Sequence, residues 1–344
     1  MRNLIVAALV CGTTMTAIGS VGHAADRWTC NVFPGPKHFI NKSVKPWGKE
    51  VVAATKGEVQ VNFLPTSAAP PPKQIDAIVA GTFDCAIIFH GFTTKRAVGP
   101  GFGMLPFRNE GNAEQGSVAY WRTWQKHFEA KNEFADDDIK ILSMFQFSGV
   151  HFFTSEDKPI NSIADMKAQK MWALAGTSSR TMKAAGVNHV SGPASRMAEF
   201  TQTKVIQGIA GATRSGIAIF AGVQFPKFGT FTSKSMMVPS FAWMVSKKKW
   251  DSLSAETKKA VMSVSGEKLA RATGRIADQF EAANQKKLAA AGIKEVKASK
   301  AFEAELMKAA EPQISGWIKQ SDGIGVSGKQ VLEAFDAMVR KLGS

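Results

Sequence analysis

The chain has 344 residues, 44% of them hydrophobic and 21% charged, a composition that excludes a disordered chain, a collagen and a coiled-coil rod. Its length has room for about two domains. Lys and Arg number 43 against 28 Asp and Glu, a net charge of +15, but the basic residues stand in short scattered groups. Because no long basic tract is interleaved with aromatic residues, we expect a basic solvated surface and no nucleic-acid partner.

The first residues have the pattern of an export signal. Arg2 precedes the apolar run 4–10, and Gly22 and Ala24 occupy the two small-residue positions that a signal peptidase requires. The apolar run is too short to span a bilayer as a permanent helix. We therefore expect residues 1–24 to be a signal peptide that is cleaved after Ala24, and the mature protein to be periplasmic.

Two cysteines follow the predicted leader. Cys30 and Cys85 fall inside the predicted strands 28–33 and 83–89. An exported protein meets conditions that permit disulfides, so the two can pair if their strands are neighbours. Two buried free thiols are the alternative, and the residues favour neither.

Hydrophobic periodicity predicts that strands and helices alternate in the first part of the chain. The predicted elements are strand 28–33, helix 43–56, strand 59–64, helix 73–80 and strand 83–89. This order implies a parallel sheet with helices on both faces, in which the first and third strands are adjacent.

A second alternating unit follows helix 112–131 and strands 139–146 and 150–154. Its predicted elements are helix 162–167, strand 170–174, helix 178–185, helix 195–203 and strand 205–212. The pattern predicts a second α/β unit over about 155–235, with strand 150–154 crossing from the first unit to the second.

A long helix is predicted over 255–291, with Ser254 as its N-cap and Gly292 after its end. At 1.5 Å per residue it would be about 55 Å long, enough to run across both units. Gly266 and Gly274 inside it allow bends. Two amphipathic helices, 301–319 and 330–342, are predicted after it.

No catalytic motif stands out. The six histidines form no HExxH pair and no close metal-ligand spacing, and neither a nucleophile elbow nor a phosphate-binding P-loop is present. We therefore expect no metal, no cofactor and no enzymatic activity.

Several stretches, in order along the chain, carry a resemblance to a known family. They are Ala-Pro-Pro-Pro-Lys-Gln through Gly-Thr-Phe-Asp at 69–84, Met-Leu-Pro-Phe at 104–107, Lys-Pro-Ile at 158–160 with Asp-Met-Lys at 165–167, Phe-Thr-Gln through Gly at 200–208, and Trp-Asp-Ser-Leu-Ser at 250–254. Together they resemble the DctP-like solute-binding proteins of TRAP (tripartite ATP-independent periplasmic) transporters. The resemblance covers most of the chain beyond the leader.

The resemblance implies a type II-like, two-lobed Venus-flytrap fold with a domain-spanning helix. Lobe I is expected at 25–148 plus 239–279, and lobe II at 149–238 plus 280–344. The lobes would close over a small organic solute and deliver it to integral membrane permease subunits. The candidate ligand-binding residues are His38, Phe39, Phe89, His90, His151, Trp172, Gln207, Gly211 and Trp243.

One departure from the family pattern concerns Trp172. The family typically has an arginine there, which holds a solute carboxylate by paired hydrogen bonds. The tryptophan predicts an atypical site in which the solute packs against the indole. The alternative is that Trp172 only fills space and that Arg196 or Arg214 holds an anion instead.

Two other functions stay open at this stage. The chain can be a periplasmic enzyme on a two-lobed scaffold, with His38, His90 or His151 as a base. It can also be the receptor of an ABC importer, which the same fold serves.

Overall fold

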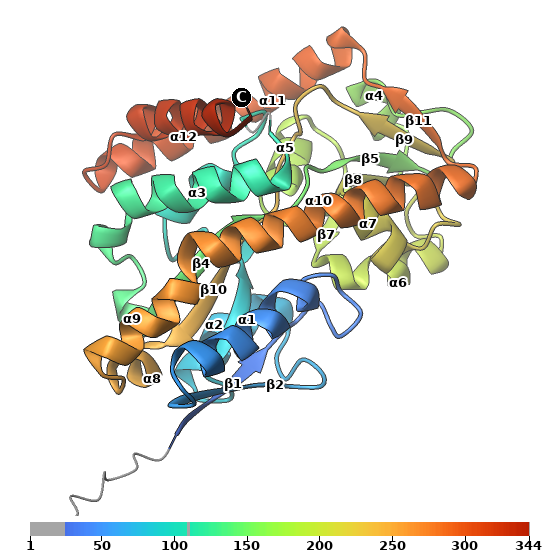
Figure 1. Cartoon of the computed structure of the whole chain (residues 1–344). Helices are drawn as coiled ribbons and strands as arrows, with labels where there is room; N and C mark the ends of the chain where they lie inside the picture. Colours follow the sequence, from blue (N-terminus) through green and yellow to red (C-terminus); the bar gives the residue numbers. More distant parts are fainter. Residues whose placement is uncertain (1–24, 109–110, 344) are drawn as a thin grey trace, which may run out of the picture.

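The computed structural model describes residues 25–108 and 111–343 (Figure 1). The predicted leader, residues 1–24, and its cleavage site lie outside this part. The described chain forms two mixed β-sheets, each covered by helices, and one long helix lies across both.

The first sheet has the strand order β2-β1-β3-β10-β4. Its strands are β1 (Asp26–Asn31), β2 (Val59–Phe63), β3 (Cys85–Phe89), β4 (Ile139–Gln146) and β10 (Ser240–Ser246). Strands β1, β2 and β3 are parallel, and β10 runs antiparallel to both β3 and β4. The predicted adjacency of the first and third strands is confirmed.

The register between β1 and β3 determines whether the two cysteines can pair. Cys30 of β1 lies directly opposite Cys85 of β3, with 4.5 Å between their Cα atoms, and the two form a disulfide. Of the two alternatives left open by the residues, the structure has the disulfide.

Three helices belong with this sheet: α1 (Asn41–Ala54), α2 (Gln74–Val79) and α3 (Ala113–His127). The N-terminus of α3 is a capping box, in which the Asn112 side chain accepts a hydrogen bond from the Gln115 N–H and the Gln115 side chain accepts one from the Asn112 N–H.

The second sheet has the order β11-β9-β5-β8-β6-β7. Its strands are β5 (His151–Thr154), β6 (Met171–Leu174), β7 (His189–Gly192), β8 (Gly208–Ala212), β9 (Phe228–Phe231) and β11 (Lys294–Lys297). The helices beside them are α4 (Ile163–Lys167), α5 (Thr177–Ala184), α6 (Met197–Gln202) and α7 (Arg214–Gly216), the last continuing into the π-helical turn Ile217–Ala221.

Two short crossover segments join the halves and run side by side. The Phe147 N–H donates to the Pro239 carbonyl at 2.9 Å, and the Val150 N–H donates to the Met237 carbonyl at 3.0 Å. Two crossover segments linked in this way can bend together, which is the geometry expected of a hinge.

The long helix is present as two pieces, α9 (Ala255–Val264) and α10 (Gly266–Ala290), preceded by the short α8 (Lys247–Asp251). The Ser254 side chain accepts a hydrogen bond from the Thr257 N–H, as predicted for the N-cap. A break falls at Ser265, where Gly266 has a φ of +49°. α10 lies across both halves, since it packs against α3 and β4 of the first and α7 of the second (Figure 1).

The chain ends in two helices, α11 (Lys300–Gly323) and α12 (Gly328–Gly343). α11 packs against α5, whereas α12 packs against α3 (Figure 1). The expected lobe II, which includes all of 280–344, stays a prediction; within that range α12 packs against both α11 and α3. Within the ranges that the structure describes, no helix combines the length and the apolar character needed to cross a membrane.

Candidate functional site

A cavity of about 90 Å³ lies between the two sheets, and both halves of the molecule line it. The first half contributes residues from the carboxyl ends of β1 and β3. The second half contributes Leu174 at the end of β6 and two groups of residues that end or follow strands. These are Pro193, Ala194, Ser195 and Met197 after β7, and Gly211, Ala212, Thr213 and Gly216 at the end of β8 and just beyond it. Ligands of open α/β sheets bind at this edge, because the loops that follow parallel strands gather there.

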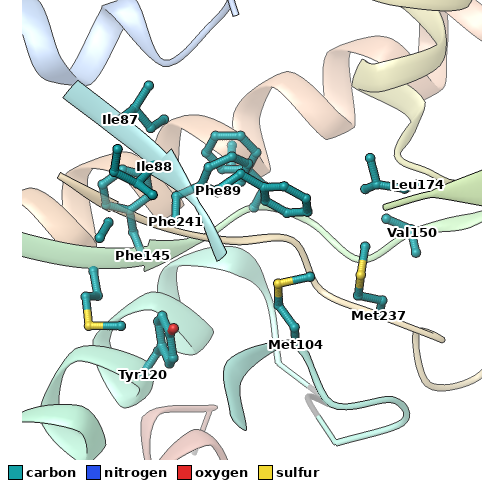
Figure 2. Close-up of a cluster of buried hydrophobic side chains, with 14 of the residues drawn as sticks. Ile87, Ile88, Phe89, Met104, Tyr120, Phe145, Val150, Leu174, Met237 and Phe241 are labelled. Carbon is teal, nitrogen blue, oxygen red and sulfur yellow. The ribbon is translucent and has the colours of Figure 1, made fainter. Parts of the chain in front are cut away.

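The walls of the cavity are dominated by phenylalanine. Seven rings line it, namely Phe33, Phe39, Phe89, Phe92, Phe147, Phe220 and Phe241. Phe147 and Phe241 are in ring contact with centroids 4.1 Å apart, and Phe89 lies 5.2 Å from Phe241. Figure 2 shows Phe89 and Phe241 on one side and Val150 and Leu174 on the other. Such walls favour a flat apolar ligand.

His38 is the buried polar residue of the cavity wall. It precedes α1 and is 6% exposed, with its ring 4.3 Å from Phe39 and 5.7 Å from Phe147. The ring of Phe220, from the second half, lies 5.8 Å from the His38 ring in a stacked orientation. Burial lowers the pKa of His38 from 6.5 to about 3, so the imidazole is neutral at physiological pH.

No charged side chain lines the cavity among the described residues. Besides His38, the polar side chains are Ser195, which is exposed, and Thr213, whose hydroxyl oxygen accepts a hydrogen bond from the Gly216 N–H. The site therefore offers neutral hydrogen bonds and a large apolar surface.

Four of the nine predicted residues meet at this cavity: His38, Phe39, Phe89 and Gly211. Gly211 has a φ of +108°, and a Cβ there would come within 2.5 Å of Ser178 Oγ, so the position requires glycine.

His90, Gln207 and Trp243 lie outside the cavity lining. His90 is buried in a network in which its Nδ1 is 3.0 Å from the Tyr120 hydroxyl, and burial lowers its pKa to about 3. Trp243 is fully buried against Trp47, with ring centroids 5.4 Å apart. Gln207 precedes β8, at the strand end opposite Gly211, where its side chain accepts a hydrogen bond from the Lys170 N–H.

Trp172 is not at the cavity wall either. It lies two residues before Leu174 on β6 and hence on the same face of the sheet, but its indole is fully buried and its Nε1 has no partner within the described chain. Leu174, not Trp172, reaches the cavity. The expected packing of a solute against the indole is therefore not what this structure shows.

The two alternative arginines are engaged elsewhere. Arg214 pairs with Glu281 and Glu295, and its guanidinium lies 3.9 Å from the centroid of the Phe231 ring. Arg196 is exposed and pairs with Glu199. Neither is among the residues that line the apolar cavity.

His151 lines a second, polar cavity of about 280 Å³ together with Arg214, Asp278 and Glu281. Burial, and to a smaller extent the charge of Arg214, lowers the pKa of His151 to about 3, and its Nδ1 has no partner in the described part of the chain. This cavity lies beside the crossover segments, since Ser148 and Ser235 also line it.

Sequence reasoning missed most of the aromatic wall. Phe33 follows β1, so the expectation that strand ends line the site, which named Phe39, applies equally to Phe33. Phe147, Phe220 and Phe241 come from a crossover segment, a π-helical turn and the start of an antiparallel strand. No local signal distinguishes these rings from core residues.

Two α/β halves joined by paired crossover segments and facing each other across an apolar cavity define a periplasmic-type solute-binding protein. A family model described as "Bacterial extracellular solute-binding protein, family 7" matches residues 31–320, and the chain belongs to this family. It is a TRAP-type solute-binding protein of the DctP family and not an enzyme.

The chain is similar to several characterised proteins. It is 33% identical over 295 residues, 86% of each chain, to the "Outer membrane transporter protein TsaT" of Comamonas testosteroni. A TRAP periplasmic solute-binding protein from Bordetella bronchiseptica with bound (R)- and (S)-mandelate has a TM-score of 0.85 at 24% identity, over 92% of this chain and 99% of that one. A TRAP protein from a marine metagenome, specific for aromatic acids and solved with 3-hydroxybenzoate, has a TM-score of 0.81 at 26% identity over the same shares.

Proposed function

We propose that this chain is the receptor of a TRAP transporter and that its solute is a small aromatic acid bound in the apolar cavity. The observation that carries the proposal is the wall of seven phenylalanine rings contributed by both halves of the molecule. The relative solved with 3-hydroxybenzoate, an aromatic acid, supports it. Aromatic rings pack well against one another in offset or edge-to-face arrangements.

The mode of capture follows from the lining. A solute that contacts Phe89 and Phe241 from one half and Leu174 and Phe220 from the other stabilises the closed arrangement of both. The bending elements are the crossover segments 147–150 and 232–239. The closed receptor then delivers the solute to integral membrane permease subunits, which are its proposed protein partners.

In the proposed function, the solute site lacks the arginine that is typical of the family. With Trp172 at the position of the family's arginine and its indole buried, no cation faces the solute from β6. The lobes are proposed at 25–148 plus 239–279 and at 149–238 plus 280–323, with α12 returning to the first.

A thermal-shift screen of the purified protein against aromatic acids, aliphatic acids and sugars tests the solute class. Ligands that bind only the folded state raise the melting temperature. We expect the largest shifts with benzoate-like acids, and shifts confined to aliphatic acids or sugars would contradict the proposal. We also propose periplasmic export with cleavage after Ala24, which the intact mass of the periplasmic protein tests.

A further inference from the structure

Among the described residues that line the cavity, His38 is the buried polar side chain, and a backbone hydrogen bond orients its imidazole. The Ile40 backbone N–H donates to His38 Nδ1 at 3.2 Å. A neutral imidazole that accepts at Nδ1 carries its proton on Nε2, so the backbone selects the Nε2–H tautomer. The other ring nitrogen is therefore a hydrogen-bond donor.

This donor is held in place and is unused by the protein. Phe39 and Phe220 stack on the ring, and Phe147 packs against it at a tilt. His38 Nε2 forms no hydrogen bond with any described residue, and it is not among the fully buried polar atoms that lack a partner. The ring lines the cavity, so the surface left to this nitrogen faces the space that a solute would occupy.

Because the surroundings of His38 are apolar, its single donor discriminates between solutes that have an acceptor oxygen and solutes that lack one. A polar group in an apolar site costs free energy when it is left without a hydrogen bond. A solute that cannot accept from Nε2–H leaves the donor unpaired, whereas a solute with a well-placed oxygen satisfies it. Sites that hydrogen-bond a substrate in this way reject analogues that lack the bonding atom.

We infer that His38 is the specificity-determining residue of the cavity, and that its Nε2–H donates to an acceptor oxygen on an aromatic solute without forming an ion pair. The inference rests on the proposed function and deepens it, because it states how the acid group of the aromatic solute is held. The group is bound by neutral donors, with Thr213 and Ser195 as the other hydroxyls in reach of the cavity. In holding the acid group, the uncharged His38 takes the role that an arginine has in the family.

The test is calorimetric titration of the whole protein with 3-hydroxybenzoate. We expect His38→Phe, which keeps the ring stacking and removes the donor, to weaken binding by at least about tenfold. His38→Gln places an amide N–H near the position of Nε2 and is expected to bind within about threefold of the parent protein. His189→Phe is the matched control, because His189 lies on β7 outside the cavity lining and bonds Ser179.

The absence of an ion pair has its own readout in the unmodified protein. Without a cation in the wall, the neutral analogue 3-hydroxybenzamide is expected to bind within about tenfold of the acid, with little change in affinity between roughly 20 and 300 mM salt. An amide that binds more than about tenfold weaker than the acid, or affinity that falls steeply with salt, would show that a cation holds the carboxylate and would overturn the inference.

Binding of 3-hydroxybenzoate to His38→Phe as tight as to the parent also overturns it, while the proposed function stands. If His38→Phe does not fold, nitrogen-15 NMR of histidine-labelled protein decides. The neutral Nε2–H form of His38, kept on ligand addition with a shift of Nε2, supports the inference, and a doubly protonated ring or an unmoved signal overturns it. A parent protein that binds neither 3-hydroxybenzoate nor any other aromatic acid overturns both the inference and the proposed function.

Discussion

Asp278 and Glu281 lie one turn apart on α10 and cap helices that belong to different halves of the molecule. Asp278 accepts from the N–H groups of Ala113 and Glu114 at 2.8 and 3.0 Å, at the start of α3. Glu281 accepts from the N–H groups of Arg214 and Ser215 at 2.8 and 3.1 Å, at the start of α7. Carboxylates are favourable at helix N-termini because the backbone N–H groups there lack partners.

Through these two caps the long helix is joined to both halves of the molecule. The residue before α7, Thr213, lines the cavity, so Glu281 positions one wall of the solute site from outside it. Burial raises the pKa of Glu281, because the cost of desolvating the carboxylate exceeds what its hydrogen bonds return.

The first prediction separates the charge of Glu281 from its hydrogen bonds. Glu281→Ala leaves the Arg214 and Ser215 N–H groups without an acceptor and should lower the free energy of unfolding by about 2–3 kcal/mol. Glu281→Gln keeps an acceptor oxygen and removes the buried charge, so it should destabilise less. Urea unfolding at neutral pH measures both, and equal losses for the two variants would contradict the role of the oxygen as a cap.

Three buried histidines should make the protein sensitive to mild acid. Burial lowers the pKa of His38, His90 and His151 to about 3, whereas the same groups titrate near 6.5 when unfolded. The unfolded chain therefore binds more protons between these values, so stability is complete above about pH 6.5 and is lost as the pH falls toward 3. At pH 5 each histidine should cost about 2 kcal/mol relative to pH 7.5.

His90→Phe tests this contribution, because the difference in unfolding free energy between the two pH values cancels any constant loss from the substitution. We expect that difference to shrink by about 2 kcal/mol. A pH dependence identical to that of the parent protein would show that His90 titrates normally in the folded state.

The disulfide should stabilise the first sheet strongly. Cys30 and Cys85 are separated by 55 residues, and a cross-link across a loop of that length removes chain entropy worth about 4 kcal/mol from the unfolded state. The double variant Cys30→Ala/Cys85→Ala should unfold at correspondingly lower urea concentration. Thiol counting in denaturant should find none of these two cysteines free until a reductant is added.

A pair of glycines on long helices should respond in opposite directions to the same substitution. A Cβ at Gly274 of α10 would come within 2.4 Å of the Ala113 carbonyl oxygen, whereas a Cβ at Gly316 of α11 meets nothing within 4 Å. Gly274→Ala should cost about 1–3 kcal/mol by forcing α10 away from α3. Gly316→Ala should stabilise the helix by up to about 1 kcal/mol. Melting temperatures of the two variants give the comparison directly.

Trp172 should matter for packing and not for solute contact. Its indole is fully buried and its Nε1 has no partner in the described structure. Trp172→Phe should therefore bind 3-hydroxybenzoate within about threefold of the parent protein, and Trp172→Ala should lose about 3–5 kcal/mol of stability. A Trp172→Phe variant that keeps its melting temperature but loses binding would contradict this prediction and indicate that the indole contacts the solute.

Much of the fold was accessible from local patterns. The alternation of strands and helices predicted both α/β units, and the apolar strands 28–33 and 83–89 were correctly placed side by side. Ser254 correctly marked the start of the long helix. Of the two glycines predicted to allow bends, Gly266 lies at the break, whereas α10 continues through Gly274. These features depend on periodicity, capping and backbone conformation, which are properties of neighbouring residues and so can be read along the chain.

The composition of the solute site was decided by tertiary structure. His38, Phe39 and Phe89 were predicted from the ends of the first strands, because strand ends meet at one edge of a sheet, and Gly211 was predicted from the family resemblance. Trp172 and Leu174 share a face of β6, yet only Leu174 reaches the cavity, because depth along a strand depends on what packs over it. The rings of Phe147, Phe220 and Phe241 come together from separate segments, and sequence spacing carries no information on such contacts. The neutral state of His38 likewise arises from burial among those rings, which only the packed structure supplies.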